Sequence, residues 1–400
     1  MSTEVRPMTE ADIEPAVAIQ AEAFGGNAAA WVQRLRSGAR YTWRDGWVVE
    51  RDGEIAAAAI AIPMIWHYHG AAYPISAIEG VAVRPTDRRR GLASMLMRAM
   101  LQADLALCRP ISLLYPFRSG FYRRLGYATV GLTHFYRLPL AQLLDDPTLR
   151  SNVRPLHERD HQAVYDLHRQ SLLSGAGGLE RSAAQWAKRW GQAEERWVVY
   201  DDSAIDGYLV YQRIEDQLYI RELVALSGAA ERGLWAFVAA QAEQVVAATY
   251  HAPIDRPLWA LLFEPPMYQA ATRGEDLYDA ATLAVGLMGR LVDVAAAFAQ
   301  RRVDPALRGG LTLALHDPVI AANTATLRIE IADGRVTVAP TEAAPEASCD
   351  IVTLTQLFCG VLRASDACWQ GRMTADPATA MLLDRALNGP APFLHPADYF

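Results

Sequence analysis

Three consecutive arginines, Arg88 to Arg90, stand directly before Gly91 and the small residue Ala93. An apolar strand at residues 77–83 precedes them, and the apolar spacing that follows Gly91 predicts a helix. The start of a helix offers free backbone N–H groups at the positive end of the helix dipole. Gly91 lets the backbone approach an anion closely, and Ala93 leaves room for it. The pattern therefore predicts a site for a pyrophosphate group.

Other phosphate-binding loops do not fit this segment. The Walker loop needs Gly-x-x-x-x-Gly-Lys-Ser/Thr and the dinucleotide loop needs Gly-x-Gly-x-x-Gly, and neither pattern occurs here. The simpler alternative is a basic helix start on the surface with no ligand. Arginines at the positive end of a helix are unfavourable unless an anion is expected there, which favours the binding site.

A second group of residues follows at 121–127, with the sequence Phe-Tyr-Arg-Arg-Leu-Gly-Tyr. Together the two segments resemble motif A and the Tyr-x-(Arg/Lys)-x-Gly-(Phe/Tyr) segment of the GCN5-related N-acetyltransferases (GNAT). The resemblance implies that acetyl-CoA is the co-substrate and that Tyr122 is the general acid beside the thioester sulfur. The alternative for Tyr122 is a half-buried aromatic residue that packs on the sheet. The residues that the resemblance assigns to the cofactor are Val81, Ala82, Val83, Arg88, Arg89, Arg90, Gly91, Leu92, Ala93, Ser94, Phe117 and Arg118.

Composition and charge restrict the class of protein. The chain has 400 residues, 52% hydrophobic residues and a net charge of −7, which indicates a globular protein of two or three domains and argues against nucleic-acid binding. The N-terminus does not resemble a signal peptide, and the richest apolar run, residues 55–66, is broken by Pro63 and is too short to span a membrane. Four cysteines and nine histidines show no metal-binding spacing. We therefore expect a cytoplasmic protein without a metal.

The first part of the chain, residues 1–147, reads as one α/β unit, and residues 148–286 repeat part of it. Residues 222–235 match residues 79–93 with one deletion. In the second copy Ala230 and Glu231 replace the arginines, and Trp235 replaces Ala93. Because glutamate repels phosphate and an indole would fill the cradle, we expect the second unit to be structural.

The last part of the chain, residues 287–400, has a different pattern. We expect a helix from Gly289, a hairpin about Asp333-Gly334, and helices at residues 351–362 and 377–386. Two acetyltransferase-like units followed by such a module resemble the enhanced intracellular survival (Eis) aminoglycoside N-acetyltransferase family over essentially the whole chain. The resemblance implies an α/β fold with two tandem GNAT-like domains, a third domain like a sterol carrier protein, and a homo-oligomer, specifically a hexamer.

The C-terminus is the other candidate for chemistry. Phe393, Leu394, Tyr399 and Phe400 would expose apolar surface unless they dock in a pocket. In the resembled family the terminal carboxylate is the general base, which implies this role for Phe400. Glu79, on the strand beside the expected thioester, is the second candidate. A hydrophobic tail at a subunit interface, with no chemistry, is the alternative.

Two departures from the family bear on the acceptor. Arg118 stands where the family often has an acidic residue, and Tyr399 is not acidic. Both weaken the expectation of an aminoglycoside and leave the expectation of an amine acetyltransferase intact. Four aromatic residues could line an amine pocket or belong to the core: Phe24, Trp31, Tyr41 and Trp66. The competing function is a carrier that binds a lipid through the third module and keeps a vestigial acetyltransferase domain.

Overall fold

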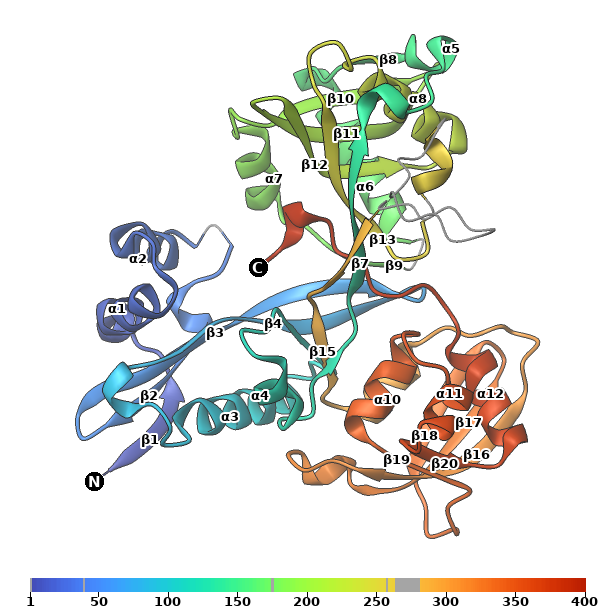
Figure 1. Ribbon diagram of the computed structural model, residues 1–400. Helices are drawn as coiled ribbons and strands as arrows, with labels where there is room; N and C mark the ends of the chain where they lie inside the picture. The colour runs from blue at the N-terminus through green and yellow to red at the C-terminus, as the bar shows by residue number, and fades with distance from the viewer. Residues whose placement is uncertain (1, 39, 174–175, 257, 263–280) are drawn as a thin grey trace, which may run out of the picture.

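The computed structural model describes residues 2–38, 40–173, 176–256, 258–262 and 281–400. The chain forms three lobes, each built on its own sheet (Figure 1). The last residues leave the third lobe and run back to end between α2 (Ala28–Ser37) and α7 (Ala183–Trp190) of the other two lobes.

The first sheet has the strand order β1-β2-β3-β4-β5-β15-β6, and β9 pairs with β3 beside it. Its central strands, β3 and β4, are long and pair with each other along most of their length. The strands are β1 (Thr3–Pro7), β2 (Gly46–Arg51), β3 (Glu54–Tyr68), β4 (Ala71–Val83), β5 (Ile111–Leu114), β6 (Ala128–Thr129), β9 (Ala176–Leu179) and β15 (Met288–Leu291).

Helices cover both faces of this sheet. The continuous apolar run at residues 56–62 is buried on both sides, as expected for a strand between two layers. Alternate residues from Ala57 pack with α3, and those from Ala58 pack with α1. The helices are α1 (Ile13–Phe24), α2 (Ala28–Ser37), α3 (Leu92–Ala106) and α4 (Ser119–Arg123).

The second sheet takes one of its strands from the first part of the chain. Its order is β14-β7-β13-β12-β11-β10-β8, and β7 pairs with both β13 and β14. In return β15 pairs with β5 and β6 of the first sheet. The strands are β7 (Leu132–Pro139), β8 (Val153–Pro155), β10 (Arg196–Asp201), β11 (Ile205–Ile214), β12 (Gln217–Ala225), β13 (Ala247–Pro253) and β14 (Ala281–Val285). The helices are α5 (Pro147–Arg150), α6 (His161–Leu172), α7 (Ala183–Trp190) and α8 (Gly228–Ala239).

The third sheet has the order β18-β17-β16-β19-β20. Its apolar core continues into the end of the β3–β4 ladder, where Trp66, Tyr68 and Tyr73 are buried against it. The strands are β16 (Gly309–His316), β17 (Ala325–Ala332), β18 (Arg335–Pro340), β19 (Ala347–Asp350) and β20 (Met373–Ala375). The helices are α9 (Val294–Gln300), α10 (Ile351–Phe358), α11 (Ala364–Trp369) and α12 (Pro377–Leu387).

Most of the predicted elements are present, and one is wrong. Asp333 and Gly334 both have positive φ at a two-residue turn between β17 and β18, which confirms the predicted hairpin. The helix predicted from Gly289 is incorrect at its start, because residues 288–291 form strand β15 and the helix begins at Val294. The first three residues of the predicted helix, 289–291, instead pair between β5 and β6 of the first sheet, and no local pattern indicates this pairing.

Candidate active site

The site is built around a gap between two parallel strands. β4 and β5 pair from Ile75 with Ile111 to Ile78 with Leu114, where β5 ends and β4 continues to Val83. The N–H of Arg84 donates to the Ala56 carbonyl of β3 at 2.9 Å. Since successive N–H groups of a strand point to opposite sides, those of Val83 and Val81 face the gap. A ligand with acceptor groups can therefore pair with this open edge.

A bulge in β4 sits at the mouth of the gap. Ala58 pairs with Ala82 and Ile60 with Glu79, so one residue of β3 opposes two of β4. Gly80 has φ +67°, and a Cβ there would lie 2.5 Å from the side-chain nitrogen of Gln20. That nitrogen donates to the Gly80 carbonyl at 2.9 Å. The bulge needs glycine and sets the direction of the neighbouring Glu79.

The arginine loop, residues 88–91, leads directly into α3. Gly91 is the N-cap residue in the left-handed conformation, with φ +81°, and nothing in the described structure lies within 4 Å of a Cβ placed on it. The N-cap makes no side-chain hydrogen bond and the first turn holds no acidic residue. Free N–H groups and a positive dipole end therefore meet an open space, as an anion site requires.

Asp87 stabilises this loop through hydrogen bonds to two arginines. It is 5% exposed and accepts hydrogen bonds from Arg51 at 2.5 Å and from Arg84 at 2.6 Å. The side-chain hydrogen bond from Arg84, ahead of its charge, lowers the pKa of Asp87. Within the described residues, Arg88 and Arg89 are exposed and form no ion pair, so their charges remain available to a ligand.

Tyr122 lies on α4, in the apolar cluster that contains Ile78, Leu92 and Leu114. It is 6% exposed, and burial raises its pKa to about 12. Its hydroxyl has no hydrogen-bond partner in the described part of the chain. The neighbouring Tyr127 differs, because its hydroxyl is 2.7 Å from that of Ser112. Tyr122 is therefore packed on the sheet, as the alternative interpretation requires, and it also carries a protonated hydroxyl that is free of hydrogen bonds within the described residues.

Phe117 and Arg118 lie in the segment between β5 and α4. Phe117 is 77% exposed, and the Arg118 guanidinium lies 5.5 Å from the centre of its ring. An aromatic side chain with this much exposed surface at the edge of the gap could cover an apolar ligand segment.

A cavity of about 270 Å³ lies at the other side of the β4 bulge. It brings together Glu79 and Phe400, two candidates for the general base that are far apart in the sequence. The Tyr41 hydroxyl donates to Glu79 Oε1 at 3.3 Å. The other lining residues are Gln20, Phe24, Trp31, Arg34, Leu35, Ile60 and Gly80.

The C-terminal tail reaches this cavity along a defined path. The N–H of Phe393 donates to the Ala176 carbonyl at 2.8 Å, and Phe393 and Leu394 are buried as expected. Tyr399 is 37% exposed, and Arg40 Nη1 donates to its carbonyl at 3.1 Å. The Phe400 ring centre lies 5.4 Å from that of Tyr115.

A buried ion-pair network anchors the tail to the second lobe. Arg181 donates to both carboxylate oxygens of Asp398, at 2.7 and 2.9 Å, and to Glu222 at 2.8 Å. Burial alone would raise the pKa of Glu222, but the charge of Arg181 holds this pKa well below its usual range. Glu222 also accepts from Arg189 at 3.1 Å and from the Tyr208 hydroxyl at 2.6 Å. The network fixes the chain two residues before its end.

The predicted site residues thus fall into two groups joined by β4. Tyr122 lies in the apolar cluster that also contains the buried face of α3, and Phe400 and Glu79 line the cavity on the other side of residues 78–81. Of the four aromatic candidates, Phe24, Trp31 and Tyr41 line the cavity. Trp66 is fully buried, and its ring N–H donates to the Gly177 carbonyl at 2.6 Å, so it belongs to the core.

The residues that hold the tail and shape the bulge were not predicted from the sequence. Gly80 inside a strand was a recognisable sign of a bulge. Nothing in the sequence paired Asp398 with Arg181, which lies 217 positions earlier.

The matching helix of the second lobe starts differently. Ser227 caps α8 by accepting from the N–H of Ala230 at 3.1 Å, and Glu231 in the first turn pairs with Arg256 at 2.6 Å. Trp235 is 2% exposed in the core. The position equivalent to Glu79 is Glu222, which the tail network occupies. The start of α8 therefore has a side-chain cap and an acidic residue in its first turn, and the start of α3 has neither.

Comparison with known proteins agrees with this architecture. Acetyltransferase (GNAT) domain families match residues 4–130 and 177–291, and a sterol carrier protein domain family matches residues 294–395. The chain is 26% identical over 378 residues to N-acetyltransferase Eis of Mycobacterium tuberculosis, which covers 87% of this chain and 88% of that protein. These matches confirm two GNAT domains followed by a sterol-carrier-like domain.

Solved structures show the same fold over the whole chain. A GCN5-related N-acetyltransferase from Kribbella flavida has a TM-score of 0.83 at 26% identity and covers all of this chain and 98% of that chain. Eis1 from Mycobacterium abscessus has a TM-score of 0.79 at 20% identity and covers 99% of this chain and all of that chain.

The protein is therefore an acetyltransferase of the GNAT class. More particularly, the chain is similar to the N-acetyltransferase Eis over most of its length. No helix among the described residues is long and apolar enough to cross a membrane.

Proposed function

We propose that the chain transfers the acetyl group of acetyl-CoA to a primary amine, and that the first GNAT domain performs the transfer. The observation that carries this proposal is the open edge of β4 beyond Leu114, beside the uncapped start of α3. Acetyl-CoA supplies an acetyl group activated as a thioester.

The residues around the gap fit the parts of acetyl-CoA. Arg88, Arg89, Arg90 and the free N–H groups of residues 91–94 hold the pyrophosphate, since Arg88 and Arg89 form no ion pair within the described residues and the start of α3 faces an open space. The N–H groups of Val81 and Val83 hold the carbonyl groups of the thioester and the pantetheine arm, and Ala82 lies between them. Phe117 and Arg118 cover the arm from the other side.

Two groups carry the protons of the reaction. An amine is protonated at neutral pH, so a base must take a proton from it before it can attack. The Phe400 carboxylate takes this proton, directly or through water, and Glu79 in the same cavity is the alternative base. Tyr122 gives a proton to the leaving thiolate, and its raised pKa keeps it protonated at neutral pH.

The Eis resemblance suggests aminoglycosides as one class of acceptor amine and a hexamer as the assembly. It also suggests the cytoplasm as the compartment. Light scattering of the purified protein would measure the assembly, since a mass near that of one chain would contradict a hexamer.

Charge reversal at the arginine loop tests the cofactor site. Arg88→Glu removes a donor and places a negative charge beside the pyrophosphate, so we expect the KM for acetyl-CoA to rise at least about tenfold. The matched change in the second domain, Glu231→Ala, breaks only a partly exposed ion pair and should leave the KM unchanged. Release of free thiol from acetyl-CoA measures both. Equal damage by the two changes would contradict the assignment of the site to the first domain.

Loss of the tail anchor tests whether the position of the C-terminus matters. Asp398→Asn keeps the side-chain shape but leaves Arg181 with one carboxylate fewer in a buried site, which should cost about 3 kcal/mol of stability. We expect kcat to fall about tenfold while the KM for acetyl-CoA is kept. The exposed pair of Asp333 and Arg308 gives the control, Asp333→Asn, which should change neither. An unchanged kcat in Asp398→Asn would show that the tail contributes packing alone.

A further inference from the structure

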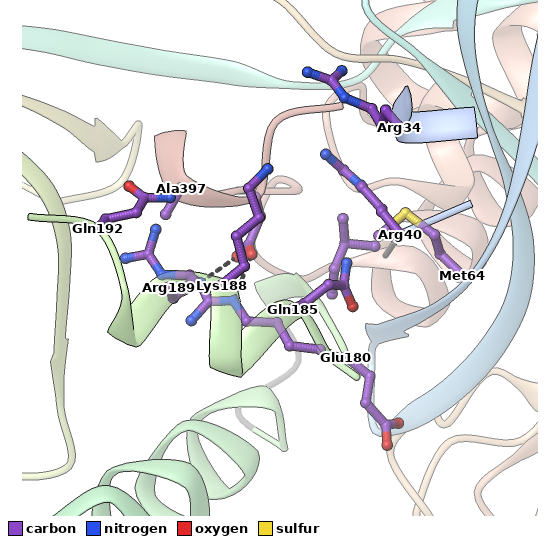
Figure 2. Close-up of a pocket in the computed structure, with 12 residues that line it drawn as sticks. Arg34, Arg40, Met64, Glu180, Gln185, Lys188, Arg189, Gln192 and Ala397 are labelled. Atoms are coloured by element: carbon purple, nitrogen blue, oxygen red, sulfur yellow. Dashed lines mark hydrogen bonds and ion pairs between the residues drawn. The ribbon is translucent and has the colours of Figure 1, made fainter. Parts of the chain in front are cut away.

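A second cavity lies next to the one that contains Glu79 and Phe400, and positive charges dominate its lining. It has a volume of about 230 Å³ and lies between α7, Arg34 and Arg40 of the first lobe, and the C-terminal tail (Figure 2). Arg34 lines both cavities, so they meet at this side chain. The charged lining residues are Arg34, Arg40, Glu180, Arg181, Lys188, Arg189 and Asp398.

The two carboxylates of this cavity already have partners. Asp398 pairs with Arg181. Glu180 lies 3.2 Å from His67 Nε2, and Figure 2 shows its carboxylate turned away from the arginines. Arg181 and Arg189 in turn pair with buried carboxylates, so their charges are compensated.

Three cations of the cavity have no such compensation. Within the described residues, Arg34, Arg40 and Lys188 form no ion pair with a carboxylate of the lining. Arg40 gives one N–H to the Tyr399 carbonyl. Figure 2 shows the charged ends of these three side chains turned toward the same space. Lys188 is also the only lysine in the 400 residues.

Buried N–H donors without partners point to the same conclusion. Arg181 Nη1 and Arg189 Nε are buried and make no hydrogen bond, although both side chains line the cavity and are 4% and 6% exposed. Arg40 Nε is in the same state. Unsatisfied donors of this kind are rare in folded proteins and need an explanation. An anion in the cavity would supply acceptors for them.

We propose that the acceptor amine carries an anionic group, a carboxylate or a phosphate, which binds Arg34, Arg40 and Lys188. Its amino end then reaches the cavity of Glu79 and Phe400, where two negative charges attract it. This proposal rests on the acetyl transfer proposed above and names the class of acceptor.

The same charges disfavour polycationic acceptors. An aminoglycoside carries several ammonium groups, and those beyond the reacting one would meet the three uncompensated cations. Like charges brought together at a binding site lower affinity and exclude the wrong partner. The charge pattern therefore selects a molecule that is positive at one end and negative at the other.

Matched pairs of small amines test this proposal. One arm compares ω-amino acids, from β-alanine to 6-aminohexanoate, with alkylamines of the same carbon count. A second arm compares O-phosphoethanolamine with ethanolamine and so separates phosphate from carboxylate recognition. A third arm uses kanamycin and spermidine. We expect the best acid-bearing amine to have a kcat/KM at least about tenfold above its acid-free partner and above both polycations, with the advantage reduced by added salt.

Charge reversal of Lys188 separates recognition from chemistry. Lys188→Glu should remove most of the advantage of acid-bearing amines and leave the KM for acetyl-CoA unchanged, whereas Lys188→Arg should retain it. The control Arg385→Glu changes an exposed arginine on α12 of the third domain and should alter nothing. Equal or better kcat/KM for alkylamines or polycations would overturn the proposal, as would equal loss for both members of each pair in Lys188→Glu.

Failure of the acetyl transfer itself would look different. In that case no amine of any arm would be acetylated, although the protein is folded. Titration calorimetry of the ω-amino acids and alkylamines in the presence of CoA then decides the recognition independently. Binding of the amino acids that weakens in Lys188→Glu would support the proposal, and no binding would overturn it.

Discussion

Removal of Phe400, or extension of the chain by a C-terminal tag, is expected to lower kcat for amine acetylation by about 10³-fold. Either change removes or displaces the terminal carboxylate of Phe400, a residue that lines the same cavity as Glu79. A positioned base contributes typically 10² to 10⁴ in rate. The affinity for acetyl-CoA should stay the same, because the arginine loop and the start of α3 lie on the other side of β4. Steady-state release of free thiol and calorimetric binding of acetyl-CoA measure the two quantities.

The controls separate the carboxylate from the phenyl ring and from the tag itself. Phe400→Ala keeps a terminal carboxylate and loses the packing against Tyr115, so it should retain part of the activity. The same tag at the N-terminus, which lies far from the C-terminus in Figure 1, should have no effect. Full activity of the C-terminally tagged protein would remove Phe400 from the mechanism and leave Glu79 as the base.

Tyr122→Phe is expected to lower kcat by about 10²-fold with the KM for acetyl-CoA nearly kept. The change deletes a hydroxyl that makes no hydrogen bond in the described structure, so stability should not fall. With the acid gone, the thiolate must take its proton from water. A stopped assay of acetylated product at saturating acetyl-CoA gives kcat directly.

Tyr127→Phe is the matched control for this deletion. The Tyr127 hydroxyl is fully buried and bonded to Ser112, so its loss should cost about 1 kcal/mol of stability and leave kcat unchanged. The two variants should therefore show opposite patterns in kcat and melting temperature. The same kcat in Tyr122→Phe as in the unmodified protein would reduce Tyr122 to a packing residue.

Local sequence patterns predicted much of the fold because they depend on neighbours in the chain. The turn at Asp333-Gly334 and the start of α3 at Gly91 each follow from spacing or backbone preference. The exchange of β7 and β15 between the first two sheets could not be predicted, because the pairing partners of each strand lie far from it in the sequence. The proposed boundaries after residues 147 and 286 remain predictions.

The candidate site was predictable where one segment carries it and not where three segments meet. The arginine loop is continuous with the start of α3, and Asp87, the residue directly before Arg88, pairs with the nearby Arg84. The cationic cavity combines Arg34, Lys188 and the tail, which lie far apart in the sequence, so their joint charge becomes visible only in the folded chain. The sequence also weakened the expectation of an aminoglycoside acceptor. It did so through Arg118 and Tyr399, which do not line this cavity.

A crystal structure of the protein with its native C-terminus and bound CoA is the most direct test of the central claim. We predict that the pyrophosphate lies at the start of α3, between Arg88 and Ser94. The sulfur of CoA should lie in the gap between β4 and β5, within hydrogen-bonding distance of the Tyr122 hydroxyl. The Phe400 carboxylate should lie in the cavity beside Glu79, where it can reach the acceptor amine directly or through one water. CoA bound at the start of α8, or a C-terminus that lies away from the cavity, would contradict the account.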